Sequence, residues 1–300
     1  MVRSLMDLLE LRDPRVARRR GETALTEEQF RRTLDGAAEI FREESLRVKG
    51  AIPSLVVNDP GAIRSRKIKL VDIGEAELDE LGTGGNADSI DQAFEDQVIL
   101  RAHKTVKITD LLVKASQRGG MVDLWRDSGN AAGQVVVDKE NDAIINGGRG
   151  VKGLSNATGI QTFASAGAWT TAGDFWKDIL KVQGKMWEKK IPTTRLTGIV
   201  HPTDLTNAFQ VFSGTADPQA QVAKMMQMIP GGLHASTKVT AGKAYFHPGL
   251  PNVFQQVVYE DLHVVPLPRL DEEERMRVRT SFALHKPRPE GIVEVTSIDA

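Results

Sequence analysis

DKENDAIINGGRGVKGLSNAT, residues 138–158, joins the charged end of a predicted helix to a glycine-rich turn. The helix should end at Asn146-Gly147-Gly148, because glycine adopts the positive φ of a helix C-terminus without steric cost. The turn that follows holds too many glycines for a helix or a strand. A phosphate-binding loop is the less favoured interpretation, since such a loop follows a strand and opens a helix. The stretch therefore predicts a long helix from about residue 128 to residue 146 that ends in a tight turn.

Length and composition limit the class of protein. The chain has 300 residues, 40% hydrophobic and 26% charged, which is typical of a globular protein with two lobes or one elaborated domain. A formal net charge of −1 gives no chain-wide surface for a polyanion. The lack of cysteine excludes disulfides, thiolate metal sites and cysteine nucleophiles. No apolar run reaches the roughly 18 residues of a membrane span. The N-terminal arginines follow the apolar part, the reverse of a secretory signal, so we expect a cytoplasmic protein with no membrane contact.

The first 25 residues are expected to form an arginine-rich arm. Residues 1–20 contain six arginines against three carboxylates. One interpretation is a solvated arm without fixed structure. The other is contact with a neighbouring subunit or with packaged nucleic acid, because arginine neutralises phosphates without sequence specificity. The candidates to face a lumen or nucleic acid are Arg15, Arg18, Arg19 and Arg20. An amphipathic helix should follow over residues 26–47, where a capping-box sequence precedes apolar residues at helical spacing.

Residues 62–110 predict a projecting hairpin. Residues 67–71 alternate as a strand does, residues 82–88 form a glycine-rich polar loop, and residues 98–100 and 105–108 are expected to return as strand. A two-stranded hairpin is marginal in water, so we expect an adjacent copy of the chain to support it. The candidates on this hairpin for ion pairs between subunits are Lys67, Lys69, Arg101 and Lys107.

The remaining sequence predicts a mixture of helices and strands. A helix over residues 172–190 should bury Phe175, Ile179, Val182 and Met186, with Trp176, Leu180 and Trp187 widening that face. A second lobe is expected over residues 193–261, with a strand at 196–200, helices through 205–212 and from 218, and strands at about 237–246 and 253–259. Alternation over residues 276–284 and 292–298 predicts two strands that return to a sheet.

No motif for catalysis is found. The sequence has no GxxxxGK[ST], HExxH or GxSxG pattern. Its six histidines are scattered without ligand spacing, and His201-Pro202 and His247-Pro248 are expected at strand ends. The acidic run at 271–274 is expected to form a solvated turn rather than a cation site. We therefore predict no catalytic, cofactor-binding or metal-binding residue, and a protein that works through contacts.

The order of these elements resembles that of shell proteins with the Hong Kong 97-type fold, which include the major capsid proteins of tailed phages and the encapsulins. LTEEQFRRTLDGAAEIF at residues 25–41 resembles the N-terminal helix of encapsulins. DAIINGGRGVKGLSN at residues 142–156 resembles the helix end that leads into GVKGL in that family. The similarity in order covers about residues 25–298, and it is close at residue level over residues 138–159.

The resemblance implies an α+β fold with named parts. These are an N-terminal arm and helix (1–61), an extended E-loop hairpin (62–110), a P-domain with a long spine helix (111–192), an inserted A-domain (193–262) and strands that return to the P-domain (263–300).

It also implies a function, that of a major capsid protein which assembles into pentamers and hexamers of an icosahedral shell around double-stranded DNA. Non-specific DNA contact, scaffold, portal or decoration partners, assembly in a host cytoplasm and a place in the virion follow from the same resemblance. One alternative is an encapsulin shell that encloses a cargo enzyme. An alternative from another class is a two-lobed soluble enzyme with an unrecognised site, for which His201 and His234 are the candidates to lie in a cleft.

Overall fold

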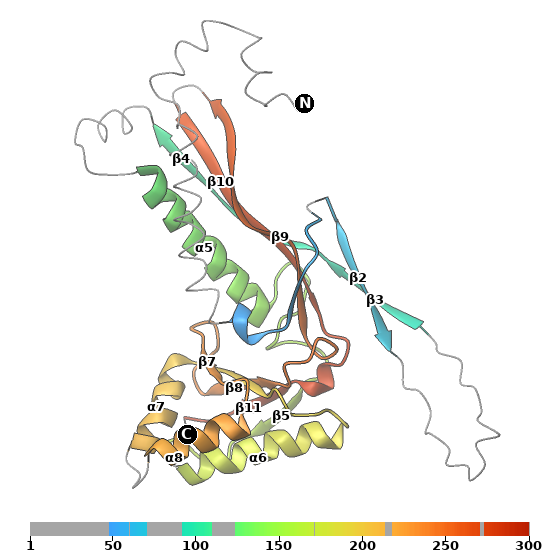
Figure 1. The fold of residues 1–300 in the computed structure, drawn as a ribbon, viewed down its shortest axis with the longest axis vertical. Helices are drawn as coiled ribbons and strands as arrows, with labels where there is room; N and C mark the ends of the chain where they lie inside the picture. Colours follow the sequence, from blue (N-terminus) through green and yellow to red (C-terminus); the bar gives the residue numbers. More distant parts are fainter. Residues whose placement is uncertain are drawn as a thin grey trace, which may run out of the picture. The chain divides into compact units, whose positions relative to one another are not determined.

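The computed structural model describes residues 48–59, 61–70, 92–109, 124–170, 172–213, 218–270 and 273–299 (Figure 1). Four predicted features lie outside these residues: the arginine-rich arm, the helix at 26–47, the loop at 82–88 and the first two acids of the run at 271–274. The chain divides into two compact units. The first contains the segments Ala102–Val137 and Leu262–Thr280, and the second contains Ser45–Arg101, Asp138–Asp261 and Ser281–Ala300.

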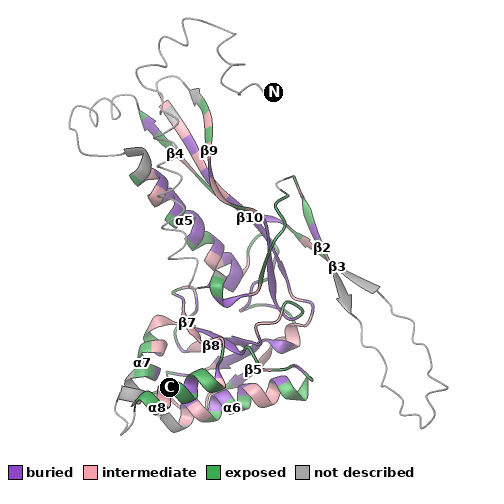
Figure 2. Ribbon diagram, in the orientation of Figure 1, coloured by how far each residue is buried: buried purple, intermediate pink, exposed green. Residues whose placement is uncertain are grey.

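In the first unit, a helix covers one face of a sheet. The sheet has the order β1-β9-β10-β4, and it contributes parts of β4 (Leu100–Thr109), β9 (Gln255–Leu270) and β10 (Glu273–His285) to this unit. The helix is the first part of α5 (Leu124–Asn146). Buried side chains from the helix and the strands form one apolar cluster, whose members are Ala102, Ile108, Ala132, Val136, Val137, Val264, Met276 and Val278. Figure 2 shows buried positions along α5 and along β10.

The place of β4 differs from the sequence prediction. Residues 105–108 were expected to return as a strand of the hairpin, but β4 lies beside β10. The physical reason is its apolar alternation, since Ala102 and Ile108 enter the cluster with α5. The predicted strand at 253–259 is also too short, because β9 continues through Pro266 and Pro268 to residue 270. Beyond the three residues that pair with β1, no described strand lies on the outer side of β9, and proline is tolerated at such an edge position.

The second unit is built on a five-stranded sheet with the order β5-β11-β8-β6-β7. Its strands are β5 (Gln161–Ala164), β6 (Thr197–Val200), β7 (Leu233–Ala235), β8 (Lys243–His247) and β11 (Val293–Thr296). The expected strand at 237–246 is therefore a shorter strand at 243–247. Two short 3-10 helices, Lys49–Ala51 and Pro289–Gly291, complete the described elements together with the helices and the hairpin below.

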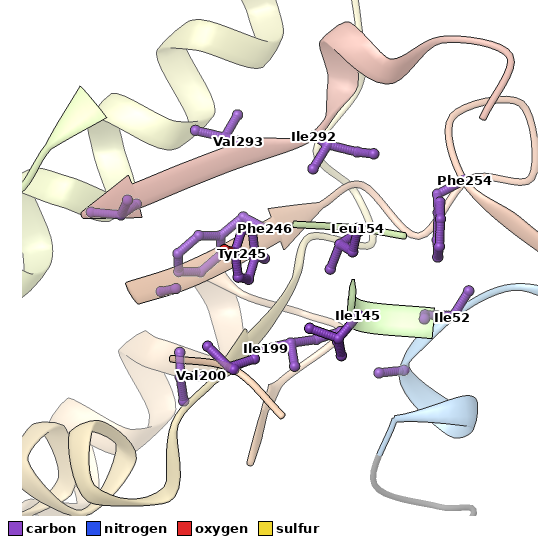
Figure 3. Packing of buried hydrophobic residues seen from close by; sticks show 14 of the residues in the cluster. Ile52, Ile145, Leu154, Ile199, Val200, Tyr245, Phe246, Phe254, Ile292 and Val293 are labelled. Atoms are coloured by element: carbon purple, nitrogen blue, oxygen red, sulfur yellow. The ribbon is translucent and has the colours of Figure 1, made fainter. Parts of the chain in front are cut away.

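β11 corrects a second expectation. Residues 263–300 were expected to return to the sheet beside the long helix. β11 instead pairs in parallel with β5 and antiparallel with β8 in the five-stranded sheet. Three consecutive residues of β11 are buried in this sheet: Val293, Glu294 and Val295. Val293 and Val295 of this strand therefore belong to the hydrophobic core of the second unit, which also contains Phe246 and Ile199 (Figure 3).

Three helices accompany the five-stranded sheet: α6 (Ala172–Glu188), α7 (Pro202–Ser213) and α8 (Pro218–Met228). The predicted buried face of α6 is confirmed, since Phe175, Ile179, Val182 and Met186 are almost completely inaccessible. The predicted widening of that face is wrong for two residues, because Leu180 and Trp187 are 56% and 57% exposed.

A buried carboxylate ties α6 to the loop before it. Asp178 accepts hydrogen bonds from the Ser165 hydroxyl, from the Ala166 amide at 3.0 Å and from the Trp169 indole nitrogen at 2.9 Å. Three donors compensate for its removal from water.

Candidate assembly site

The glycine turn after α5 caps the helix and closes on itself. Gly147 has φ of +76°, and its amide donates to the Ala143 carbonyl at 2.9 Å. The amide of Leu154 donates to the Ile144 carbonyl at 2.9 Å, and the amide of Gly153 donates to the Asn156 side chain at 2.7 Å. These amides are used within the turn, so the helix-ending prediction is confirmed and the amides do not form a phosphate cradle.

The hairpin consists of β2 (Arg64–Leu70) and β3 (Gln92–Val98), which pair only with each other in their own antiparallel sheet among the described residues (Figure 1). The prediction of strand near residues 67–71 is confirmed. The returning strand is β3, which sequence reasoning placed at residues 98–100. The loop that joins the two strands lies outside the described residues.

Three buried hydroxyl and imidazole groups anchor the base of the hairpin. The Tyr259 hydroxyl donates to Ser65 Oγ at 2.6 Å, and Ser65 Oγ lies 2.5 Å from Nε2 of His285. Because Ser65 accepts from Tyr259, its own proton is available for the imidazole. Ser65 and His285 are inaccessible to solvent, so this serine–histidine pair joins strands and is not placed to meet a substrate.

Lys67 gives the hairpin a second anchor in the same copy. Its ammonium donates to the Gln255 side chain at 2.6 Å and to the Pro251 carbonyl. Lys67 was predicted to bind a neighbouring subunit, and the structure shows an internal role that the sequence did not indicate. The side chain of Lys69 lies outside the described part of the chain.

The other two ion-pair candidates are not on the hairpin. Arg101 and Lys107 lie on β4, in a different sheet. The Arg101 guanidinium is exposed and donates to the Ala62 carbonyl at 3.5 Å. The Lys107 ammonium lies 3.2 Å from the carboxylate of Glu273 within the same copy. The prediction that these residues share the hairpin with Lys67 is therefore wrong. The lumen-facing candidates Arg15, Arg18, Arg19 and Arg20 fall outside the described residues.

Several apolar side chains at the base of the hairpin and on β1 reach solvent. The short strand β1 (Ser54–Val56) pairs in parallel with β9, and both Leu55 and Val56 are about half exposed. At the start of the hairpin, Ile63 is 79% exposed and Val98 is 52% exposed. These exposed aliphatic residues are candidates for a contact surface.

The histidines and acids of the described residues form no group that could hold a metal ion. His201 precedes α7 and accepts from the Thr203 amide at 3.3 Å, and β8 ends at His247, so the predicted positions at strand ends are confirmed. His234 bonds to the Gly231 carbonyl at 2.9 Å.

No helix in the described ranges is long and apolar enough to cross a membrane.

Comparison with known proteins identifies the fold. The sequence matches no protein-family profile and no curated protein. A virus-like particle from Pyrococcus furiosus is similar in structure, with a TM-score of 0.66 at 14% identity over 90% of this chain and 100% of that one. The capsid of Myoviridae phage XM1 gives a TM-score of 0.64 at 13% identity over 84% of this chain and 91% of the phage chain.

The capsid of the native GTA particle gives a TM-score of 0.61 at 14% identity, over 84% of this chain and 90% of the other. The chain thus has the fold of capsid shell proteins, the Hong Kong 97-type fold that its sequence resembles. The expected mixture of helix and sheet is confirmed at this level.

Proposed function

We propose that the chain is a major capsid protein that assembles into an icosahedral shell around double-stranded DNA. The observation that carries this proposal is the likeness to capsid structures of two phages and of the GTA particle, over 83–84% of this chain. Among the described residues the hairpin sheet pairs with no further strand, and Leu55, Val56, Ile63 and Val98 are exposed. Both observations are consistent with a subunit that completes its surface on other copies.

The proposed parts of the subunit follow the observed elements. The E-loop is assigned to the hairpin and its tip, residues 62–98, which is shorter than the predicted 62–110 because β4 belongs to another sheet. The P-domain is assigned to α5, as its spine helix, with the sheet β1-β9-β10-β4. The A-domain is assigned to the five-stranded sheet with α6, α7 and α8, and would surround the centres of pentamers and hexamers.

In this proposal the arginine-rich arm contacts DNA through phosphates, without reading sequence. The protein would assemble in a host cytoplasm and end in the virion, where scaffold, portal or decoration proteins are further partners. The subunit acts through binding alone and carries no catalytic step.

A second candidate is a shell with protein cargo. It is favoured by one specific observation, the likeness to the Pyrococcus furiosus virus-like particle over the whole length of that chain. Both candidates require self-assembly and differ in their contents.

Gel filtration and negative-stain microscopy of the purified full chain test self-assembly. We expect closed particles, and a stable 32.9 kDa monomer at all concentrations would overturn both shell functions and favour the soluble enzyme. The ultraviolet spectrum of nuclease-treated native particles then separates the candidates. Protected DNA supports the capsid, and a co-purifying enzyme without nucleic acid supports the cargo shell.

A further inference from the structure

The helix α6 carries a row of lysines on its exposed surface. Lys177, Lys181 and Lys185 recur at every fourth residue, and Lys189 follows directly after the last residue of the helix. Residues four apart lie on the same side of a helix, with a rise of about 6 Å from one to the next. The row therefore runs for about 18 Å along α6, where Figure 2 shows exposed and half-buried positions.

Most of the positive charge in this row is not neutralised within one copy. Lys177 pairs with Asp174 at 2.8 Å. The ammonium groups of Lys181, Lys185 and Lys189 have no carboxylate partner among the described residues. We use the name lysine ridge for these last three residues.

The acids nearby do not compensate for the lysine ridge. Asp178 is buried and accepts hydrogen bonds from three neutral donors. The Arg288 guanidinium, which donates to a backbone carbonyl just after α6, pairs with Glu290 at 3.0 Å. Glu188 is exposed at the end of the helix, so one carboxylate stands against three lysines.

An aromatic ring positions two lysines of the ridge. Nζ of Lys181 lies 4.3 Å from the centroid of the Phe163 ring, and Nζ of Lys185 lies 5.9 Å from it. Phe163 is a buried residue of β5. The negative face of the ring attracts both ammonium groups, so they are held near each other and lose less freedom when an anion binds.

Helix stability does not explain this spacing. Lysines near a helix C-terminus interact favourably with the helix dipole, but the effect is confined to the last turn and does not reach Lys181. Like charges four residues apart destabilise a helix, and α6 contains two such pairs, Lys177 with Lys181 and Lys181 with Lys185. A line of like charges suits a partner with repeated negative charges, because a single carboxylate neutralises only one of them.

We propose that the lysine ridge binds phosphates of the packaged nucleic acid and therefore faces the lumen of the shell. This rests on the proposed function and adds a second nucleic-acid contact to that of the arginine-rich arm. Lysine binds phosphate as a point charge and does not read the base sequence. Each phosphate contact releases a counterion, so the binding should weaken as the salt concentration rises.

Acetylation of lysines in intact particles tests what the ridge faces. Particles filled with nucleic acid are compared with empty particles of the same full chain, using a small reagent that enters the shell. Lys181 and Lys185 should react several times more slowly in filled particles, whereas Lys104, exposed on β4, should react equally in both. Equal reactivity of the ridge in both kinds of particle would overturn the proposal.

The same experiment detects a protein partner. Leu180 and Trp187 are exposed on the same helix and could pack against another protein surface. In that case the ridge would react slowly in filled and empty particles alike, and this outcome would also overturn the proposal.

Matched variants measure the contact in the full chain below the concentration at which it assembles. Lys181→Gln with Lys185→Gln removes two charges from the ridge, and Lys104→Gln with Lys139→Gln removes two exposed charges elsewhere. The probe is a short DNA duplex. Loss of two phosphate contacts should reduce the slope of log Kobs against log salt concentration by about 2, and the control pair should keep the wild-type slope. An unchanged slope in the ridge variant, or an equal reduction in the control, would overturn the proposal.

A conservative pair separates charge from folding. Lys181→Arg with Lys185→Arg keeps both positive charges and should keep the wild-type slope. A reduced slope in this pair as well would show that the shape of the helix, and not its charge, had changed, and would contradict the phosphate contact.

The outcomes also separate the ridge from the proposed function. Particles that protect DNA while the ridge lysines react freely would refute the ridge contact and leave the capsid function intact. Absence of particles, or particles that hold a protein cargo without nucleic acid, would refute the packaging of DNA itself.

Discussion

Ser65 Oγ and His285 Nε2 lie 2.5 Å apart, although 220 positions separate the two residues in sequence. This contact joins the first strand of the hairpin to β10, and Tyr259 completes it from β9. A hairpin with no other strand beside it among the described residues therefore depends on side chains at its base for its position.

Ser65→Ala should loosen the hairpin. The change removes the hydrogen bonds that Ser65 makes with the Tyr259 hydroxyl and with Nε2 of His285 in a buried site. We expect the free energy of unfolding to fall by about 1–3 kcal/mol. Hydrogen exchange of the β2 and β3 amides should quicken, and the midpoint of thermal unfolding should fall. Thr206→Ala is the control, since its exposed hydroxyl donates to the Pro202 carbonyl of the same helix at 2.9 Å and lies outside the hairpin. Equal exchange rates in wild type and Ser65→Ala would contradict this role.

Gly147→Ala should destabilise the turn strongly. A methyl group there would approach the Gly153 nitrogen to 2.6 Å, and the residue has positive φ. We expect a loss of at least about 2 kcal/mol in the free energy of unfolding. Gly148→Ala is the matched control, because its added carbon meets nothing within 4 Å, and it should change stability by less than about 0.5 kcal/mol. Similar denaturation midpoints for the two variants would refute the steric explanation.

Asp178→Ala should release the loop that precedes α6. The change removes the acceptor of the hydrogen bonds from Ser165, Ala166 and Trp169. We expect the free energy of unfolding to fall by about 2–4 kcal/mol. Fluorescence of Trp169 should shift as its surroundings loosen. Asp174→Ala removes an exposed ion pair with Lys177 and should cost less than about 1 kcal/mol. The prediction fails if both aspartates prove equally dispensable in thermal unfolding.

Stability should fall with acid because of His247. Burial, with a smaller effect of His234, lowers the pKa of His247 to about 4. The unfolded chain binds this proton with a pKa near 6.5, so it binds more protons than the folded chain between these values. The contribution of neutral His247 to the free energy of unfolding is fully present above about pH 6.5. It is lost as the pH falls towards about 4, and the loss is at most about 3 kcal/mol. In His247→Gln, the midpoint of thermal unfolding should depend less on pH between about 4 and 6.5. An unchanged pH dependence would contradict the assignment to His247.

The sequence predicted elements whose signals are local. The end of α5 follows from Gly147, and the buried face of α6 follows from Phe175, Ile179, Val182 and Met186 at helical spacing. Leu180 and Trp187 were misassigned because hydrophobicity alone does not distinguish a core residue from one left at the surface.

Strand pairing was beyond local reasoning. Apolar alternation shows that β4 and β11 are strands, but it contains no information on which sheet receives them. The site was the least predictable part. Lys67 was selected for its charge, yet its bonds to Pro251 and Gln255 join residues more than 180 positions apart. The lysines of α6 recur at every fourth position in the sequence, and only the structure shows that two of them lie over the Phe163 ring.

The pairing of β5 with β11 limits when a subunit can mature on the ribosome. Thr162 and Glu294 bond across 132 intervening steps of the chain, and β11 separates β5 from β8. Among the described residues, β5 has no other neighbour in this sheet, so it cannot pair there before β11 has been synthesised. Because a contact between such distant segments requires a long loop to close, we expect the insertion of β11 to be a late step in folding.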